Sequence, residues 1–243
     1  MRATHSPLYV TKELFETRYQ GAEAIFVAGS VVRGEATTYS DLDLVVVYKK
    51  VPVAFRESFS YRDWPVEAFI HDSMTLEYFF NKVDPQIGRA TLAEMIAEGH
   101  EVPGATRLTE DLKSMARTAL AAGPKALSNE EIEDRRYQIS EWIDDLREPK
   151  NRAELIAIAS VVYNELADFY FRTHQTWTGS GKAVLKRLKK TDPAFARRFS
   201  EAFEELFATG QSQRVIDISS EVLAPHGGFL FEGYRRDVPP TRK

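Results

Sequence analysis

The chain has 243 residues, 43% of them hydrophobic, which is enough for one large or two small domains with a proper core. Its 32 basic and 36 acidic residues leave a formal net charge of −4, which argues against a protein that coats nucleic acid. The absence of cysteine excludes disulfides, thiolate metal sites and a cysteine nucleophile. No apolar run reaches membrane-spanning length and the first residues lack a signal-peptide core, so we expect a cytoplasmic protein without a membrane partner.

The first 104 residues alternate predicted helices with short, β-branched apolar runs that are typical of buried strands. Helices are predicted at residues 9–19, 31–34, 72–82 and 87–98, and strands at 25–28, 44–48, 54–62, 65–70 and 100–102. Gly21 ends the first helix, and Pro65 is tolerated as the opening residue of a strand. These elements predict a small domain, residues 1–104, with a mixed, largely antiparallel sheet.

After Gly104 the strand signals stop and helical spacing takes over. Helices are predicted at residues 107–122, 129–147, 152–172, 182–190, from 193 onward and at 211–223. Helices joined by short loops indicate a bundle, here residues 105–243. The predicted fold class is therefore α+β, a small mixed-sheet domain followed by a C-terminal helical bundle, with a disordered tail at residues 237–243.

The strongest pattern lies where the first two strands are connected. The apolar run of residues 25–28 ends at Gly29-Ser30, and ten residues later Asp41-Leu42-Asp43 opens the next apolar run. Because side chains alternate along a strand, Asp41 and Asp43 should share one face while Leu42 points into the core. Two neighbouring carboxylates repel each other, and a hard divalent cation such as Mg²⁺ would remove that cost. The alternative is a half-exposed hairpin with two solvated aspartates.

The Gly-Ser pair ahead of the aspartates has features of a phosphate site. Gly29 allows the backbone to turn sharply and to approach a ligand closely. Ser30 offers a hydroxyl, and the residues after it are expected to begin a short helix whose free N–H groups suit a phosphate.

These residues resemble the signature of the nucleotidyltransferases related to DNA polymerase beta, which include the aminoglycoside (kanamycin) nucleotidyltransferases. That pattern asks for a third carboxylate on a later strand, and Glu67, between Val66 and Ala68, is in that place. The resemblance implies that a nucleoside monophosphate, with ATP as the expected donor, is transferred to an acceptor hydroxyl with release of pyrophosphate. It also implies two Mg²⁺ ions held by Asp41, Asp43 and Glu67, with Glu67 as acceptor-side ligand or general base.

Three further residues are candidates for contacts with the nucleotide. Arg33 is close in sequence to the Gly-Ser turn, although a surface arginine is an equal alternative. Lys182 follows a glycine-containing turn and opens a helix, which suits a triphosphate contact as well as a plain connection. Tyr234, beside Arg235, could fold back over the nucleotide, with packing in the bundle as the alternative.

Three functions remain open at this stage. The favoured one is a nucleotidyltransferase with a small-molecule acceptor, an aminoglycoside-type antibiotic being one candidate, because the helical half could form an acceptor pocket and carries acids that would attract amines. The second is the same transfer to a protein or RNA, as in antitoxin-like minimal nucleotidyltransferases. The third is a catalytically silent nucleotide-binding regulator, against which the presence of all three carboxylates argues. Nothing in the sequence indicates the oligomeric state.

Overall fold

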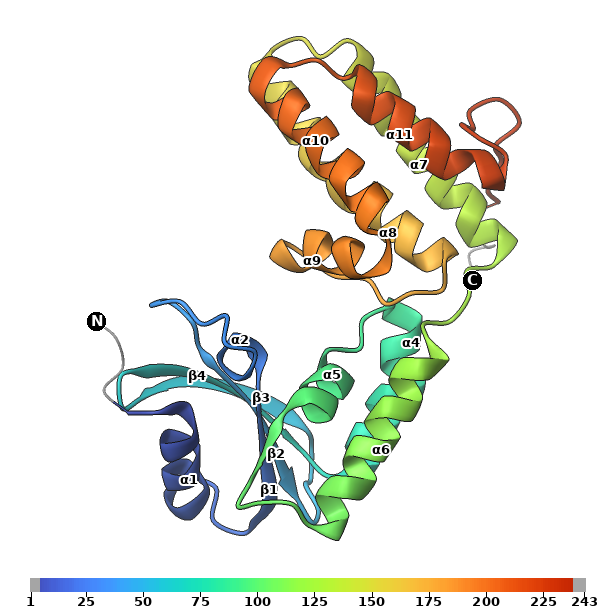
Figure 1. The fold of residues 1–243 in the computed structure, drawn as a ribbon. Helices are drawn as coiled ribbons and strands as arrows, with labels where there is room; N and C mark the ends of the chain where they lie inside the picture. Colours follow the sequence, from blue (N-terminus) through green and yellow to red (C-terminus); the bar gives the residue numbers. More distant parts are fainter. Residues whose placement is uncertain (1–4, 238–243) are drawn as a thin grey trace, which may run out of the picture. The chain divides into compact units, whose positions relative to one another are not determined.

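The computed structural model describes residues 5–237, and it confirms the predicted α+β class (Figure 1). The chain divides into two compact units, Met1–Pro124 and Lys125–Lys243, called unit 1 and unit 2 below. Of the tail predicted to be disordered, every residue after Asp237 lies outside the described residues.

Unit 1 is built on one five-stranded sheet in the order β3-β4-β2-β1-β5. The strands are β1 (Ala22–Ala28), β2 (Leu42–Tyr48), β3 (Phe55–Tyr61), β4 (Trp64–His71) and β5 (His100–Val102). Only β2 and β4 pair in parallel, and the other three pairs are antiparallel. The sheet is therefore mixed and largely antiparallel, as the sequence predicts.

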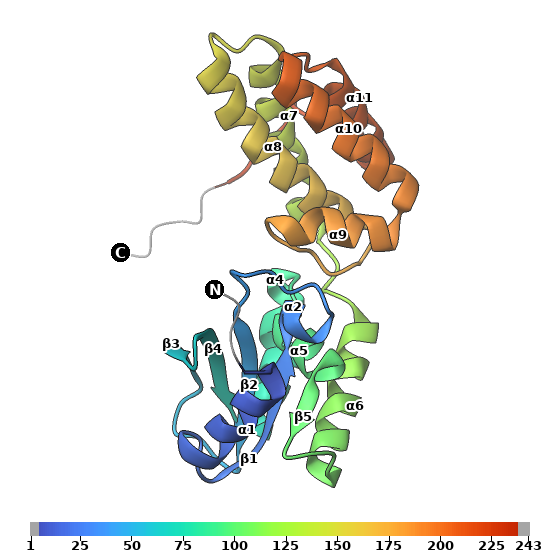
Figure 2. The same ribbon diagram turned by 60° about the vertical axis from the view of Figure 1, so that its left-hand side comes forward.

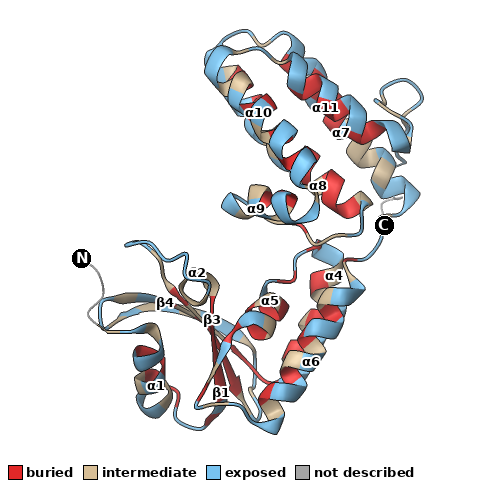
Figure 3. Ribbon diagram, viewed as in Figure 1, coloured by how far each residue is buried: buried red, intermediate tan, exposed pale blue. Residues whose placement is uncertain are grey.

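Helices cover both faces of this sheet. Those of unit 1 are α1 (Pro7–Thr17), α2 (Gly29–Val32), α3 (Ser73–Tyr78), the π-helical turn η1 (Phe79–Val83), α4 (Asp84–Ile87), α5 (Thr91–Glu98) and α6 (Arg107–Ala122). Helix α1 packs on one face, while α5, backed by α6, packs on the other (Figures 1 and 2). Because both faces are covered there, the inner strands β1 and β2 are buried along most of their length, whereas β3 is exposed or half-buried throughout (Figure 3).

The core of unit 1 explains why the second strand reads as a continuous apolar run. Leu42, Leu44 and Val46 pack with residues of α1 in one cluster of buried side chains. Val45 and Val47 point to the opposite face and are also fully buried. A strand that is buried on both faces does not alternate polar and apolar residues, and the one charged residue of β2 is the half-buried Asp43 near its start.

Capping residues set the helix boundaries of unit 1. The Asp72 side chain accepts a hydrogen bond from the Thr75 N–H at 2.8 Å, and this capping box begins α3. The helix predicted to begin at residue 87 begins later, at Thr91. The reason is Gly88, whose φ of 75° closes α4 in a left-handed cap.

Unit 2 is made of helices: α7 (Asn129–Arg147), α8 (Arg152–Thr173), α9 (Lys182–Thr191), α10 (Pro193–Thr209), α11 (Gln213–Leu223) and the 3₁₀ turn η2 (Ala224–His226). Their apolar faces form one buried cluster. Part of this cluster is aromatic. The rings of Tyr170 and Phe195 are stacked with their centroids 4.1 Å apart, and the ring centroids of Phe199 and Phe203 are 4.8 Å apart. Among the described helices of either unit, none is both long and apolar enough to cross a membrane.

The division between the units differs from the expected domain boundary. The sequence suggests residues 1–104 and 105–243, because the strands stop at Gly104. In the structure α6 packs on α5 and belongs to unit 1, so the division falls after Pro124. The apolar side of α6, with Leu112 and Ala116 buried, packs within unit 1.

Candidate functional site

Two of the predicted carboxylates are neighbours across the parallel pair of strands. Asp43 of β2 lies directly opposite Glu67 of β4 in the register. Register partners on adjacent strands point to the same face, and strands in a sheet are about 4.8 Å apart. Because Leu42 and Leu44 are buried on the α1 face, Asp43 and Glu67 both lie on the opposite face.

Asp41 directly precedes β2, which begins at Leu42. It is half-buried, like Asp43 two residues later. The fully buried Leu42 separates them, as expected for side chains that alternate across an extended segment. Asp41 lies one residue outside β2, so the prediction that both aspartates share a face depends on extended backbone just before the strand.

Gly29 is held against one of these carboxylates. It follows Ala28, the residue that pairs with Asp43 across β1 and β2, and it has φ = 77°. A Cβ atom added at Gly29 would lie 1.9 Å from Oδ2 of Asp43, closer than any real contact. A side chain at this position is therefore excluded twice, by the backbone conformation and by the carboxylate.

A hydrogen-bonded loop joins the Gly-Ser turn to the aspartates. Ser30 Oγ donates to Ser40 Oγ at 3.1 Å, and Ser40 Oγ accepts from the Thr37 N–H at 2.8 Å. The Glu35 N–H also donates to the Ser30 carbonyl at 2.9 Å. These bonds tie both ends of the loop together, so Ser30 and Asp41 are positioned by one structure.

Two arginines neutralise acids around the site. Arg33, a predicted nucleotide contact, pairs with Glu35 at 3.0 Å and with Glu98 of α5 at 3.8 Å. Arg56 of β3 pairs with Glu67 at 3.4 Å. Both arginine side chains remain largely exposed, so these pairs are weak in solvent and can open when another charged group approaches.

The donor set fits a divalent cation in its chemistry, because all three candidates offer carboxylate oxygens, the ligands that hard cations prefer. As the side chains stand, no group of three or more acids or histidines in residues 5–237 is gathered closely enough to hold a metal ion. The Glu67 carboxylate faces the Arg56 guanidinium instead, so a cationic side chain stands where positive charge is needed.

The predicted residues of unit 2 have distinct surroundings. Lys182 is exposed at the first position of α9, directly after Gly181 with φ = 52°. Tyr234 donates a hydrogen bond from its hydroxyl to Asp134 Oδ1 at 2.7 Å, and its ring stacks on Tyr137 at 4.0 Å. In the structure Lys182 is therefore a surface residue, and Tyr234 packs against helix α7.

Ser40 and Arg56 were missed at the sequence level. Ser40 directly precedes the Asp-Leu-Asp triplet, and its position between two turn-rich stretches is a signal that could have been used. Arg56 had no local signal, because its approach to Glu67 depends on how β3 pairs with β4.

Comparison with known proteins agrees with this geometry. Residues 9–102 match the family model described as "Nucleotidyltransferase domain". This stretch of the chain contains the Gly-Ser turn and all three carboxylates. The match shows that residues 9–102 are similar to a nucleotidyltransferase domain, a kind of domain that typically uses a nucleoside triphosphate and a divalent metal. The match covers unit 1 only as far as β5.

A solved structure, described as a nucleotidyltransferase-like protein from Exiguobacterium sibiricum 255-15, is similar to this chain at 13% identity. The alignment covers 90% of this chain and 73% of the other, with a TM-score of 0.44, and at that score the likeness carries no argument. No curated protein matches the chain.

Proposed function

We propose that this protein transfers a nucleoside monophosphate, with ATP as donor, to a hydroxyl group of a small-molecule acceptor and releases pyrophosphate in a Mg²⁺-dependent reaction. One observation carries the proposal. Asp43 and Glu67 are register partners on adjacent parallel strands, with the Gly29 backbone packed against the Asp43 carboxylate. This half-buried contact between backbone and carboxylate fixes the position of the Asp43 acid.

Asp41 and Asp43 would hold the divalent ions, of which we propose two. Bound there, the ions would supply positive charge to the phosphate oxygens and to the acceptor oxygen. Glu67 pairs with Arg56 in the described state and would serve as a ligand, or take the proton of the acceptor hydroxyl, once that exposed pair opens. An ion that takes the place of Arg56 would keep positive charge beside Glu67.

The Gly29–Ser30 turn would contact the terminal phosphates. Gly29 has no side chain in the way, and the Ser30 hydroxyl is within hydrogen-bonding distance of only one described residue, Ser40, to which it donates. Rotation of that hydroxyl toward a phosphate costs one half-buried hydrogen bond, on the order of 1 kcal/mol. Arg33 could add positive charge if its weak pairs with Glu35 and Glu98 open.

An amine-rich acceptor, such as an aminoglycoside, is the acceptor class we propose, on five acids of helices α7 and α8: Glu141, Asp144, Asp145, Glu165 and Asp168. Two of them are already neutralised, because Asp144 pairs with Arg147 and Asp168 pairs with Arg135. Glu141, Asp145 and Glu165 carry the remaining negative charge of this set. The acceptor class therefore rests on charge alone, and the experiment below includes acceptors without amines.

The test is a transfer assay with each of the four common ribonucleoside triphosphates, Mg²⁺ and a panel of acceptors. The panel contains aminoglycosides and neutral polyols, together with a protein and an RNA. We expect pyrophosphate release that depends on both an acceptor and Mg²⁺, and a mass increase of one nucleoside monophosphate on a small molecule. Asp43→Asn is the negative control. Equal pyrophosphate release by wild type and Asp43→Asn, or labelling of the protein or RNA alone, would contradict the proposal.

A further inference from the structure

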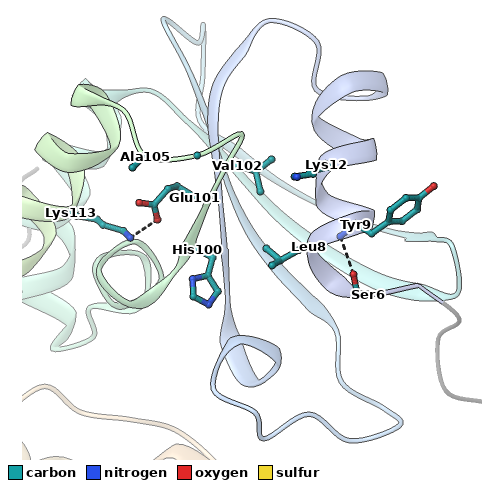
Figure 4. A pocket seen from close by; sticks show the side chains of 10 residues that line it. Ser6, Leu8, Tyr9, Lys12, His100, Glu101, Val102, Ala105 and Lys113 are labelled. Carbon is teal, nitrogen blue, oxygen red and sulfur yellow. Dashed lines mark hydrogen bonds and ion pairs between the residues drawn. The ribbon is translucent and has the colours of Figure 1, made fainter.

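A large cavity lies at the outer edge of the sheet in unit 1, away from the carboxylates. It occupies about 780 Å³ between α1 and α6 along the edge strand β5 (Figure 4). This volume lies within the range of about 300–1,000 Å³ that is typical of small-molecule sites. None of Gly29, Asp41, Asp43 and Glu67 lines it.

The charged side chains of the cavity leave one positive charge in excess. Lys113 of α6 forms an ion pair with Glu101 of β5, and both are mostly buried. Lys12 of α1 has no hydrogen-bond or ion-pair partner among the described residues. In Figure 4 the Lys12 side chain points from α1 toward β5, as does that of Leu8.

This excess runs against the charge of its surroundings. Residues 1–124 contain 13 basic and 17 acidic residues, a formal balance of 13 − 17 = −4. A local positive excess on a negative background attracts an anion at this place more than elsewhere on the unit. A lysine ammonium with no partner also keeps its donors available for a carboxylate or a phosphate.

The rest of the lining is apolar. Leu8 is 46% exposed on the cavity side of α1. Ala105 contributes further exposed apolar surface. A ligand with an apolar body would cover the Leu8 side chain and gain about 25 cal/mol for each Å² of apolar surface removed from water.

The open edge of β5 does not favour an added peptide strand. The strand is only three residues long and is followed by Pro103, which has no N–H to donate. Short edge strands that end in proline are a usual means of preventing strand addition. The cavity beside the strand, not the strand edge, is therefore the recognition feature.

We propose that this cavity is a binding site for a small organic anion, whose carboxylate or phosphomonoester pairs with Lys12 and whose apolar body packs on Leu8 and Ala105. The site is separate from the carboxylate site and does not depend on the proposed transfer reaction. His100 lines the cavity and pairs with Val27 of β1, which lies two residues before Gly29. An occupied cavity is thus connected to the Gly29 turn through β1.

Ligand-observed NMR titration of the full chain with three probes tests the proposal. The probes are phenyl phosphate, benzoate and benzyl alcohol, so that the two anion chemistries and a neutral ring are compared. We expect the anions to bind and the alcohol to bind much more weakly. Lys12→Ala should weaken anion binding about tenfold, the scale of one partly exposed charged contact. Lys49→Ala removes an exposed lysine that does not line the cavity, and it should match the wild type.

A second variant places the binding site in the cavity. Ala105→Trp adds bulk at an exposed lining position, so the fold should be retained, as an unchanged thermal transition would verify. We expect it to abolish binding of both anions while Lys12 is still present. Equal anion affinity in Lys12→Ala and Lys49→Ala, equal affinity for benzyl alcohol, or undiminished binding in Ala105→Trp would each overturn the proposal.

Discussion

The two units hold their candidate functional residues in different ways. In unit 1, Asp43 and Glu67 are neighbours because two strands pair in register, and Gly29 meets Asp43 because Ala28 is its partner on β1. In unit 2, Lys182 lies exposed at a helix start and Tyr234 is held by the side chains of another helix. Backbone pairing imposes positions within a fraction of a strand spacing, whereas side-chain contacts on a helix surface can be exchanged at small cost.

The contacts that hold Tyr234 belong to a segment that folds back on α7. The Arg136 guanidinium donates to the carbonyls of Gly227 and Gly228, each at 2.8 Å, and the Leu230 N–H donates to Ser140 Oγ. These bonds join residues about 90 positions apart in sequence. The comparison therefore predicts large effects for changes in unit 1 and small ones for changes in unit 2.

The largest effect is expected for Asp43→Asn. Loss of the charge that would hold the divalent ions should lower the transfer rate by about 10²–10³-fold, the scale for loss of one group that stabilises charge in the transition state. The folded state should be retained, because removal of a negative charge beside Glu67 relieves repulsion when no metal is bound. Steady-state kinetics and thermal denaturation without Mg²⁺ measure both. Asp63→Asn, in the β3–β4 turn at φ = 65°, is the matched control and should keep full activity.

A pH-dependent loss of stability is expected from Asp84 in unit 1. This aspartate is 5% exposed, and its Oδ2 has no hydrogen-bond partner within the described part of the chain. Burial, with a smaller effect of nearby Glu94, raises the pKa of Asp84 to about 7. The folded protein therefore holds this proton more tightly than the unfolded chain, and the free energy of unfolding should fall as pH rises from about 4 to about 7.

Asp84→Asn removes this dependence, because asparagine resembles the protonated acid. At pH 8 the variant should be more stable than the wild type by on the order of 2–4 kcal/mol, and at pH 4 the two should be similar. Urea denaturation at pH values from 4 to 8 measures the difference. A stability difference that does not change with pH would show that Asp84 is ionised equally in both states.

Gly29→Ala tests whether the Gly29–Asp43 contact is as strict as the geometry indicates. The left-handed backbone costs an alanine about 1–2 kcal/mol, and the collision with the Asp43 carboxylate adds to that cost. Gly21→Ala is a matched control, because Gly21 has φ = 83° and nothing lies within 4 Å of an added Cβ. We expect Gly29→Ala to lose about 1 kcal/mol more stability than Gly21→Ala and, unlike it, to lose transfer activity. Equal losses in thermal denaturation and activity would contradict the role of the contact.

In unit 2, Lys182→Ala should weaken binding of a nucleoside triphosphate about tenfold, or ~1.4 kcal/mol, as expected of one partly exposed charged contact. Lys190→Ala, near the other end of α9 and also exposed, is the control for general loss of positive charge. Isothermal titration with a non-hydrolysable triphosphate compares the two. The same affinity in both variants would assign Lys182 to the solvated surface.

The smallest effect is expected for Tyr234→Phe. This change keeps the stack on Tyr137 and removes the hydrogen bond to Asp134, so the stability of unit 2 should fall by about 1 kcal/mol in urea denaturation. Tyr39→Phe, at a 94% exposed ring, should have no effect. If the ring also covers a nucleotide, Tyr234→Ala should raise the KM for the triphosphate while Tyr234→Phe does not. An unchanged KM in both variants would leave Tyr234 with a packing role only.

The sequence by itself determined the elements of both units and the spacing of the candidate site. Gly29, Ser30, Asp41 and Asp43 lie within fifteen residues, so their relation is local, and the apolar runs around them have strand periodicity that can be read directly. The start of α3 was predictable for the same reason, since the Asp72 cap acts on neighbouring residues, whereas the prediction that Gly21 ends the first helix was wrong, because α1 ends at Thr17 with Arg18 as its C-cap.

Only the tertiary structure decided which distant residues meet. The parallel pairing of β2 with β4 places Glu67 opposite Asp43, and β3 then brings Arg56 to Glu67. The packing of α6 on α5 moved the division between the units from Gly104 to Pro124. The cavity beside β5 is lined by residues of α1 and α6 that are about a hundred positions apart in sequence. Such contacts depend on strand order and helix packing, and side-chain periodicity reports only which face of an element is buried, not what covers it.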